Sequence, residues 1–283
     1  MSDATELKQK IRSLEEIPTL PAFFNKLMET IECENASVKD LAKIISEDPA
    51  LTSKLLKLAN SAYYGRFKTI STTDQAVATV GFNEIKTISL SIAVFGAFSS
   101  KITNQSLENF WIHALMTATA IKLIGNRGQE TSMDKLYFAG LLHDIGKLVL
   151  CLLIGNDYLR LLSTVDSGDL TLDIEKTHYG VTHATVGKWL AERWHFPNDL
   201  KELIAHHHVP MQSGLLRPRS IATIYVGDFI AHSRADCVMP DDSNNMVRRS
   251  MDLLELNDDD VLSTCERVTR EEERIRETFS LIA

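Results

Sequence analysis

The fold is decided by the stretch Tyr137-Phe-Ala-Gly-Leu-Leu-His-Asp-Ile-Gly-Lys-Leu-Val-Leu150, which places charged side chains inside an apolar helical pattern. Its apolar residues recur at intervals of three and four, which predicts one helix packed against a core. His143 and Asp144 lie at its centre. Because an ionised carboxylate buried without compensation is too costly to keep, it is paired, protonated or bound to a metal. The pair indicates either a metal site, since imidazole and carboxylate suit divalent transition metals, or a His-Asp pair satisfied by its own hydrogen bonds.

Composition predicts an all-α protein with a sizeable core. The chain has 283 residues, of which 44% are hydrophobic, and this length allows one large domain or two modest ones. Apolar residues recur at helical spacing in many segments, and the chain has only 7 prolines and 13 glycines to break helices. The formal net charge of -8 and the pI near 5.6 argue against a protein that coats nucleic acid, so proteins or small molecules are the expected ligands.

Cysteine usage and the N-terminus indicate a protein of a reducing cytoplasm. Cys33, Cys151, Cys237 and Cys265 are far apart and form no CxxC spacing, so we expect neither a disulfide framework nor a cysteine zinc site. The first residues lack a basic and then apolar signal sequence, and no apolar run approaches the length of a membrane span. We therefore expect a cytoplasmic protein with no membrane segment.

Helix signals divide the chain into three parts. They predict an N-terminal helical subdomain over residues 1–100, a second helical subdomain with the metal site over 101–240, and a C-terminal helical extension over 241–283. The last helix of the extension is dense in charge, which is typical of a solvated face with i,i+4 ion pairs, or of a dimer contact. The predicted helix N-caps include Ser37, Asp48, Asn83 and Asn198.

Two features of the N-terminal subdomain bear on its partners. Short paired helices also occur in DNA-binding proteins, in which a second helix enters the major groove. Here the candidate recognition helix, Asn83 to Phe98, offers only Lys86 as a base, so a core helix is favoured and no nucleic-acid partner is expected. The aromatic cluster Tyr63, Tyr64 and Phe67 indicates either a partner-binding knob or, as is commoner at a helix end, domain packing.

Polar residues recur on the inward faces of other predicted helices. His113 lies on a helix expected from Ser106 to Ile124, and His183 lies in the first turn of one expected from Val181 to Trp194. Asp228 lies on the buried stripe of an otherwise apolar helix. Each of these residues alone has a structural explanation, because buried polar groups are usually satisfied by hydrogen bonds.

Periodicity ranks the three histidines of the run His206-His-His208. His207 lies four residues after Leu203, and His208 lies four residues after Ile204, so both continue the inward face of their helix. His206 falls on the polar side, although the pattern leaves open whether it replaces one of the other two as a ligand.

These inward polar groups are too many to bury separately in an all-α core, so they are expected to converge on a cation. Their number is enough for two divalent metals, drawn from iron, manganese, nickel and zinc, bridged by Asp144. Such a pair can polarise a phosphate and supply the attacking nucleophile. Lys147, one turn after His143, could reach a phosphate oxygen. The predicted metal ligands are His113, His143, Asp144, His183, His207, His208 and Asp228.

The order His, His-Asp-x-Gly-Lys, His, His-His, Asp resembles the HD superfamily of metal-dependent phosphohydrolases. More closely, residues from Ile17 to Ala231 resemble the HDOD family, the HD-related output domain of bacterial signalling proteins. Several motifs in the right order carry this resemblance. They are Leu20-Pro21, Asp48-Pro-Ala-Leu51, Asn60-Ser-Ala-Tyr63, Phe110-Trp111, Gly140-Leu-Leu-His-Asp-Ile-Gly-Lys147, His183 to Gly187, and Trp194 to Pro197.

The resemblance implies an HD-like helical bundle with an N-terminal helical subdomain. It implies a bacterial cytoplasmic signal-transduction protein that regulates or scaffolds signalling proteins and has kept its metal ligands, with His113 as the extra imidazole of two-metal relatives. The alternative that it implies is a metal-dependent phosphohydrolase acting on a nucleotide or other phosphate ester, with Asp144 and Lys147 as catalytic residues. Many members of the family have lost ligands and serve as regulatory modules, so enzyme activity stays open.

Two departures argue against one branch of the superfamily. The cyclic-dinucleotide phosphodiesterase branch follows its His-His with Glu and a Gly-Tyr-Pro loop, whereas Val209-Pro-Met-Gln-Ser-Gly214 stands here. That branch also carries an acidic residue one turn before its first His, where this chain has Asn109. Cyclic-dinucleotide hydrolysis is therefore not expected.

Overall fold

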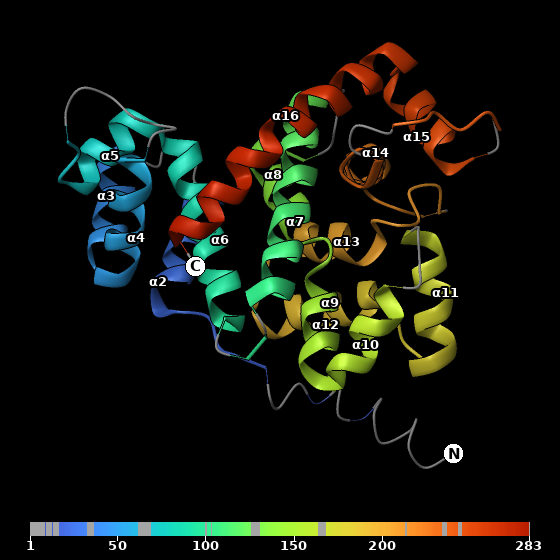
Figure 1. Ribbon diagram of the computed structural model, residues 1–283, viewed down its shortest axis with the longest axis horizontal. Helices are drawn as coiled ribbons and strands as arrows, with labels where there is room; N and C mark the ends of the chain where they lie inside the picture. Colours follow the sequence, from blue (N-terminus) through green and yellow to red (C-terminus); the bar gives the residue numbers. More distant parts are fainter. Residues whose placement is uncertain are drawn as a thin grey trace. The chain divides into compact units, whose positions relative to one another are not determined.

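The computed structural model is built from helices throughout the part of the chain that it describes (Figure 1). No strand occurs among those residues, so the predicted all-α class is confirmed. The described residues are 9, 13, 17–32, 37–61, 69–99, 101–102, 104–125, 131–163, 168–212, 214–233, 237–242 and 245–282.

The chain forms two compact units, each assembled from two separate segments. Unit 1 comprises Met1–Ile17 and Asn109–Glu272, and unit 2 comprises Pro18–Glu108 and Glu273–Ala283. The three-part division expected from the sequence, with boundaries at residues 100 and 240, stays a prediction.

Unit 2 consists largely of short helices whose capping residues can be read in the sequence. Ser37 forms a capping box with Asp40, and Asp48 accepts a hydrogen bond from the backbone N–H of Leu51, so both predicted caps are confirmed. Asn83 is not a cap, because the helix already begins at Phe82, directly after Gly81 at φ 108°. The helices are α2 (Ala22–Glu32), α3 (Val38–Ser46), α4 (Pro49–Ala59), α5 (Thr73–Val80) and α6 (Phe82–Phe98).

Helix α6 is a core helix of unit 2, as its apolar composition predicts. Ile85, Leu90 and Val94 on different sides of it are all buried, so it does not present a recognition face to solvent. Even its base, Lys86, is only 4% exposed, and its ammonium lies 5.2 Å from the centre of the Phe82 ring. The aromatic cluster Tyr63, Tyr64 and Phe67 lies outside the described residues.

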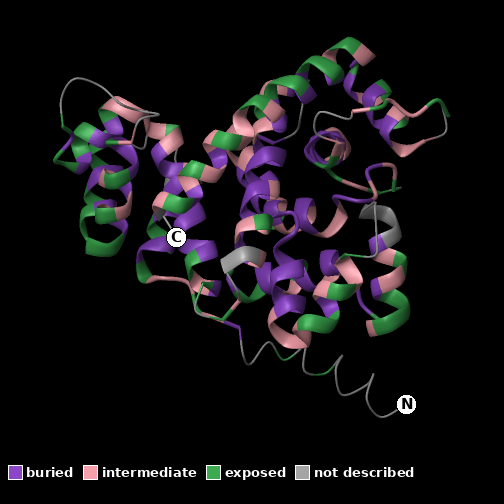
Figure 2. Cartoon of the chain, in the orientation of Figure 1, coloured by how far each residue is buried: buried purple, intermediate pink, exposed green. Residues whose placement is uncertain are grey.

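Unit 1 has a core of largely buried helices. Most residues of α9 and α14 are buried, as the purple in Figure 2 shows for much of this unit. The predicted cap Asn198 is the first residue of α13, and Pro197 takes the cap position before it. The remaining helices are α7 (Asn104–Ile124), α8 (Met133–Leu142), α9 (Ile145–Ile154), α10 (Asn156–Leu162), α11 (Gly168–Tyr179), α12 (His183–Arg193), α13 (Asn198–His206), α14 (Pro218–Ser233), α15 (Met246–Leu254) and α16 (Asp258–Ile282).

The stretch predicted as one helix is broken at its centre. Helix α8 ends at Leu142 and α9 begins at Ile145, so His143 and Asp144 occupy a turn between them. Asp144 has φ -95° and ψ 10°, outside the helical range. Neighbouring side chains on a regular helix point about 100° apart. The irregular turn departs from this spacing at His143 and Asp144, the two neighbouring residues that are both predicted metal ligands.

Residues 133–154 correct the prediction that no apolar run reaches the length of a membrane span. This 22-residue stretch has an 18-residue window of mean hydropathy 1.7. The α5 and α6 pair, bent by 116°, passes the same test of length and composition when counted together. In the first stretch, 78% of the window is buried inside the protein, which is typical of a core helix.

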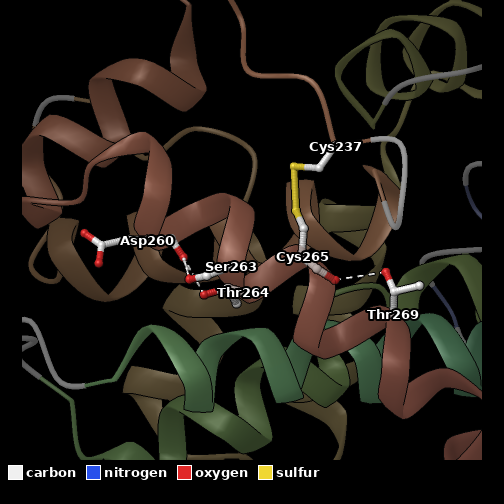
Figure 3. The surroundings of a disulfide bond; sticks show 6 residues. All are labelled: Cys237, Asp260, Ser263, Thr264, Cys265 and Thr269. Atoms are coloured by element: carbon white, nitrogen blue, oxygen red, sulfur yellow. Dashed lines mark hydrogen bonds between the residues drawn. A yellow bond between two sulfur atoms is a disulfide. The ribbon is translucent and has the colours of Figure 1, made fainter.

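Two of the cysteines form a disulfide, which the sequence reasoning did not expect. Cys237, in the segment after α14, is bonded to Cys265 on α16, and their Cα atoms are 6.4 Å apart (Figure 3). The two cysteines are 28 residues apart, and they meet only because the intervening α15 and the start of α16 return the chain to the segment after α14. Their spacing in the sequence therefore does not indicate the pair. The expectation that the cysteines form no disulfide is therefore wrong, and the expected cytoplasmic setting stays a prediction. Cys151 is a buried free thiol, and Cys33 lies outside the described residues.

The charged C-terminal helix carries the expected i,i+4 ion pair on its surface. Arg270 and Glu266 are 3.3 Å apart and both well exposed, so this pair adds little stability. The last turns of α16, in unit 2, bury Ile275 and Phe279. This helix is therefore solvated on one side and packed on the other.

Candidate metal centre

The structure brings all seven predicted ligands together in unit 1, from five separate places in the fold. They form two groups, in each of which one nitrogen or oxygen per residue lies within 4.8 Å of the others. We call Asp144, His183, His207 and His208 the four-ligand group, and His113, His143 and Asp228 the three-ligand group. They come from α7, the turn between α8 and α9, the start of α12, the end of α13, and α14. Metal binding by these residues stays a prediction.

Two glycines let α9 approach α12 closely enough to form the four-ligand group. A Cβ on Gly146 would lie 1.9 Å from the carbonyl oxygen of His183 and 2.7 Å from the backbone nitrogen of Gly187. Both contacts are with backbone, which cannot move aside without shifting α12. A Cβ on Gly187 would in turn lie 2.9 Å from a methyl carbon of Ile204. Gly187 therefore also lies where another element approaches closely, which a side chain would prevent.

Hydrogen bonds at the far side of three imidazole rings fix which nitrogen carries the proton. His143 Nδ1 lies 2.7 Å from the carbonyl oxygen of Gly140, and His207 Nδ1 lies 2.8 Å from that of Ile204. His183 Nδ1 lies 2.9 Å from Oε2 of Glu175. Because carbonyl and carboxylate oxygens accept, Nδ1 must donate in each ring. In a neutral ring the Nε2 lone pair is then free to bind a cation, which is how metal-binding histidines are commonly held.

The Nε2 atoms face one another across the centre of the site. His183 Nε2 lies 3.3 Å from His207 Nε2 and 3.0 Å from His208 Nε2. In the three-ligand group, His113 Nε2 lies 3.3 Å from His143 Nε2. His183 and His207 both donate from Nδ1, so in neutral rings their Nε2 lone pairs face each other, and a proton or a metal ion between them would remove this repulsion. The donor set of imidazole nitrogen and carboxylate oxygen fits a divalent transition metal.

Asp144 joins the two groups through its two carboxylate oxygens. Its Oδ1 lies 3.2 Å from His183 Nε2, and its Oδ2 lies 3.4 Å from His143 Nε2. Oδ2 also accepts a hydrogen bond of 2.6 Å from the ammonium of Lys147. Oδ1 is buried and receives no well-directed hydrogen bond. A carboxylate held in this way is positioned to bridge two cations.

The carboxylates of the site are held in their ionised form. Burial alone would raise the pKa of Asp144, but Lys147 and His143 hold it well below its usual range. Burial would likewise raise the pKa of Asp228, but His232 and His113 hold it well below its usual range. Both residues therefore offer negative charge to a cation at neutral pH.

The pKa values of the imidazoles differ according to the groups that surround each ring. Burial and His183 lower the pKa of His208 to about 3, and burial and His232 lower that of His113 to about 4, so both rings are neutral at neutral pH and could bind a cation. Burial also works to lower the pKa of His143, but Asp144 and Asp228 raise it to about 10. Where no metal is bound, a proton on His143 would thus supply the positive charge that the two carboxylates demand.

Two of the sequence predictions concerned residues around the ligands. His206 is half-buried and belongs to neither group, whereas His207 and His208 are only 1% and 5% exposed, so the inward ranking of the latter two is confirmed. Lys147 is 7% exposed and hydrogen-bonds to Asp144. Its expected contact with a phosphate stays a prediction.

Sequence reasoning missed three residues that contact the site. Glu175 and Tyr158 are completely buried, and the Tyr158 hydroxyl donates to Glu175 behind His183. His232 lies beside the three-ligand group, where its Nδ1 is 3.0 Å from Oδ1 of Asp228. The i,i+4 spacing of His232 after Asp228 was a readable signal. Nothing in the pattern around Glu175 distinguishes it from a surface glutamate.

Comparison with known proteins confirms the resemblance found in the sequence. The model of the HDOD domain matches residues 17–210. An "Uncharacterized protein" of Treponema pallidum (strain Nichols) is 28% identical over 197 residues, which are 69% of this chain. This chain spans only 38% of the length of that relative.

Solved structures share the fold over nearly the whole chain. A "Putative signal transduction protein" from Marinobacter aquaeolei VT8 gives a TM-score of 0.81 at 20% identity, covering 99% of this chain and 66% of that one. A "Putative phosphohydrolase" from Shewanella amazonensis SB2B gives a TM-score of 0.72 at 25% identity, covering 98% of both chains. With the fold, the motif order and the family model in agreement, the chain belongs to the HDOD domain family.

Proposed function

We propose that this HDOD protein binds a pair of divalent transition metals in the two ligand groups and uses them to bind and hydrolyse a phosphate ester. The observation that carries the proposal is the placement of Asp144, whose Oδ1 faces the four-ligand group and whose Oδ2 faces the three-ligand group. A metal pair held there would polarise a phosphate and lower the pKa of an attacking water.

The protein's own residues prepare the site for an anionic substrate. Lys147 holds Asp144 in place through a 2.6 Å hydrogen bond and adds a positive charge beside the three-ligand group. His232, whose side chain is 41% exposed, is the most accessible imidazole at the site; its Nδ1 donates to the backbone carbonyl of Asp228 at 3.1 Å and lies 3.0 Å from Oδ1 of the same residue. The residues of the four-ligand group are at most 7% exposed, so this side of the site is little accessible from solvent. A phosphate ester is therefore expected to approach from the side of His232, with Lys147 contributing to binding of the phosphate oxygens.

Hydrolysis of simple phosphate esters tests this proposal. Protein loaded with manganese or iron should release p-nitrophenol from bis(p-nitrophenyl) phosphate or p-nitrophenyl phosphate. Asp144→Asn should abolish the release, because it removes the shared charge. Asp173→Asn, which changes an exposed carboxylate on α11, is the matched control and should leave it intact. A metal-loaded wild type without turnover of phosphate monoesters, diesters or nucleotides would contradict the hydrolytic part of the proposal.

A second candidate function is signal output without catalysis, in a bacterial cytoplasm and through partner signalling proteins. It is favoured by family membership and by unit 2, whose described residues contain neither ligand group. In this case the metal centre would stabilise unit 1, and unit 2 would contact the partner. Affinity capture from bacterial lysate should then recover a kinase, a response regulator or a second-messenger protein, and Asp144→Asn should bind it as wild type does if the metal is not required.

A further inference from the structure

Glu175 is a buried carboxylate with no contact to solvent and three hydrogen-bond donors. It is 0% exposed. Its Oε2 accepts from the backbone N–H of His183 at 2.7 Å and from the ring Nδ1 of His183 at 2.9 Å. Its Oε1 accepts from the hydroxyl of Tyr158, which is itself 0% exposed. One side chain on α11 thus ties α10 to the first residue of α12.

These contacts hold His183 in both position and orientation. The bond to the backbone N–H fixes the start of α12 and satisfies one of the donors that a helix N-terminus leaves unpaired. The bond to Nδ1 fixes the ring and leaves Nε2 directed at Asp144, His207 and His208. Tyr158 holds the second oxygen and so prevents rotation of the carboxylate.

The partner of His183 differs in kind from those of the other anchored rings. His143 and His207 donate to neutral backbone carbonyls, whereas His183 donates to a carboxylate. A charged acceptor makes a stronger hydrogen bond and increases the basicity of the opposite nitrogen. His183 should therefore be the strongest imidazole donor of the four-ligand group.

We propose that Glu175 is a positioning residue, which selects the Nδ1–H tautomer of His183 and strengthens its Nε2 as a metal ligand in the four-ligand group. This inference rests on the proposed metal binding. It assigns Glu175 to one group only, because Glu175 contacts no residue of the three-ligand group in any described hydrogen bond or ion pair. Its loss should consequently weaken one metal and spare the other.

Metal affinity of Glu175→Gln tests the inference. Glutamine keeps the size of the side chain but loses its charge and can donate as well as accept, so the ring of His183 is no longer held in one tautomer. In a calorimetric zinc titration, one of two equivalents should bind about 10- to 100-fold more weakly. The other equivalent should be unchanged. Asp173→Asn, on the exposed side of the same helix, should bind both as wild type does.

A spectroscopic measurement on the wild type does not depend on the folding of any variant. In zinc-loaded protein, the ¹⁵N shifts of the His183 ring, assigned by loss of the signal in His183→Gln, should show a proton on Nδ1 and zinc on Nε2. Zinc on Nδ1, or a proton on Nε2, would overturn the inference.

The results of these experiments distinguish a failure of the role of Glu175 from a failure of the proposed metal binding. Wild-type protein that binds no metal would overturn both. Wild type that binds two equivalents, with Glu175→Gln indistinguishable from it, would overturn only the role of Glu175. If Glu175→Gln lowers both affinities equally, Glu175 supports the fold and not the ligand, and the inference is again overturned. Tyr158→Phe, which removes a single donor, should give a smaller loss at the same equivalent.

Discussion

The two ligand groups share Asp144 but differ in their surroundings. In the four-ligand group the side chains of His183 and His207 are 0% and 1% exposed, and the other ring nitrogen of each is anchored by an acceptor. In the three-ligand group the side chain of His113 is 17% exposed, and the neighbouring His232 is 41% exposed. The four-ligand group is thus buried, whereas the three-ligand group, whose His143 is itself 0% exposed, reaches solvent beside His113 and His232.

This difference indicates a division of roles. Because Asp144 would bridge the two metals, each metal would have four protein ligands, so ligand number does not separate the two groups. The difference in exposure does: the buried four-ligand group would hold a tightly bound metal that fixes the helices, and the more exposed three-ligand group would hold the metal that meets a substrate. Substitutions that change the four-ligand group, the three-ligand group or both can test this division.

Gly146→Ala should have the largest effect, because it separates α9 from α12. The added Cβ would lie 1.9 Å from the His183 carbonyl oxygen, so the backbone must shift. We expect a loss of about 4 kcal/mol or more in the free energy of unfolding, measured by denaturant titration, together with loss of the four-ligand metal. The control Gly96→Ala, on α6 with nothing within 4 Å of the added Cβ, should raise stability by about 0.5 kcal/mol. Equal effects at the two glycines would contradict the close approach.

Asp144→Asn should empty both groups while leaving the fold in place. It removes the shared charge and leaves the buried ammonium of Lys147 without its ionic partner, at a cost of about 3 kcal/mol in stability. Metal content by mass spectrometry should fall to background. Asp199→Asn, which breaks the partly buried ion pair with Lys135, should cost about 1 kcal/mol at most and keep both metals. Retention of one full metal equivalent by Asp144→Asn would show that Asp144 is not a bridge.

Asp228→Asn should affect only the three-ligand group. Asp228 contacts His113 and His143 but no residue of the four-ligand group in any described ion pair. One metal equivalent should therefore be lost and the other retained, with catalysis of phosphate-ester hydrolysis lost as well. If both equivalents disappear together, the two groups are not separable sites.

His232→Ala should have the smallest effect, because His232 is about two-fifths exposed and acts through Asp228. The expected result is a few-fold weaker affinity at the three-ligand group and an unchanged four-ligand group, read from the same zinc titration. His178→Ala, an exposed histidine on α11 that bonds only to a backbone carbonyl, serves as the control. An effect as large as that of Asp228→Asn would make His232 a ligand.

Helices and inward residues could be predicted because they depend on local pattern. Ser37 and Asp48 cap helices through bonds to residues three positions away, and His207 and His208 follow Leu203 and Ile204 on the buried face. Such relations are visible in the sequence itself. The ligand set could be assembled in the same way, one inward residue at a time.

The remaining features depend on contacts between distant segments. The turn at His143 and Asp144 interrupts an apolar pattern that by itself predicts a continuous helix. The Cys237–Cys265 disulfide and the burial of Glu175 require α16 and α11 to be placed in space. Periodicity carries no information on these approaches, because it reports which side of an element is buried and not what lies against it.

The most direct test of the central claim is the metal content of the freshly purified protein. If the seven side chains converge on a bridged pair, elemental analysis should find about two equivalents of iron, manganese, nickel or zinc per chain, falling to background in Asp144→Asn. Wild-type protein that holds none of these metals, and takes up none when they are added at neutral pH, would contradict the account.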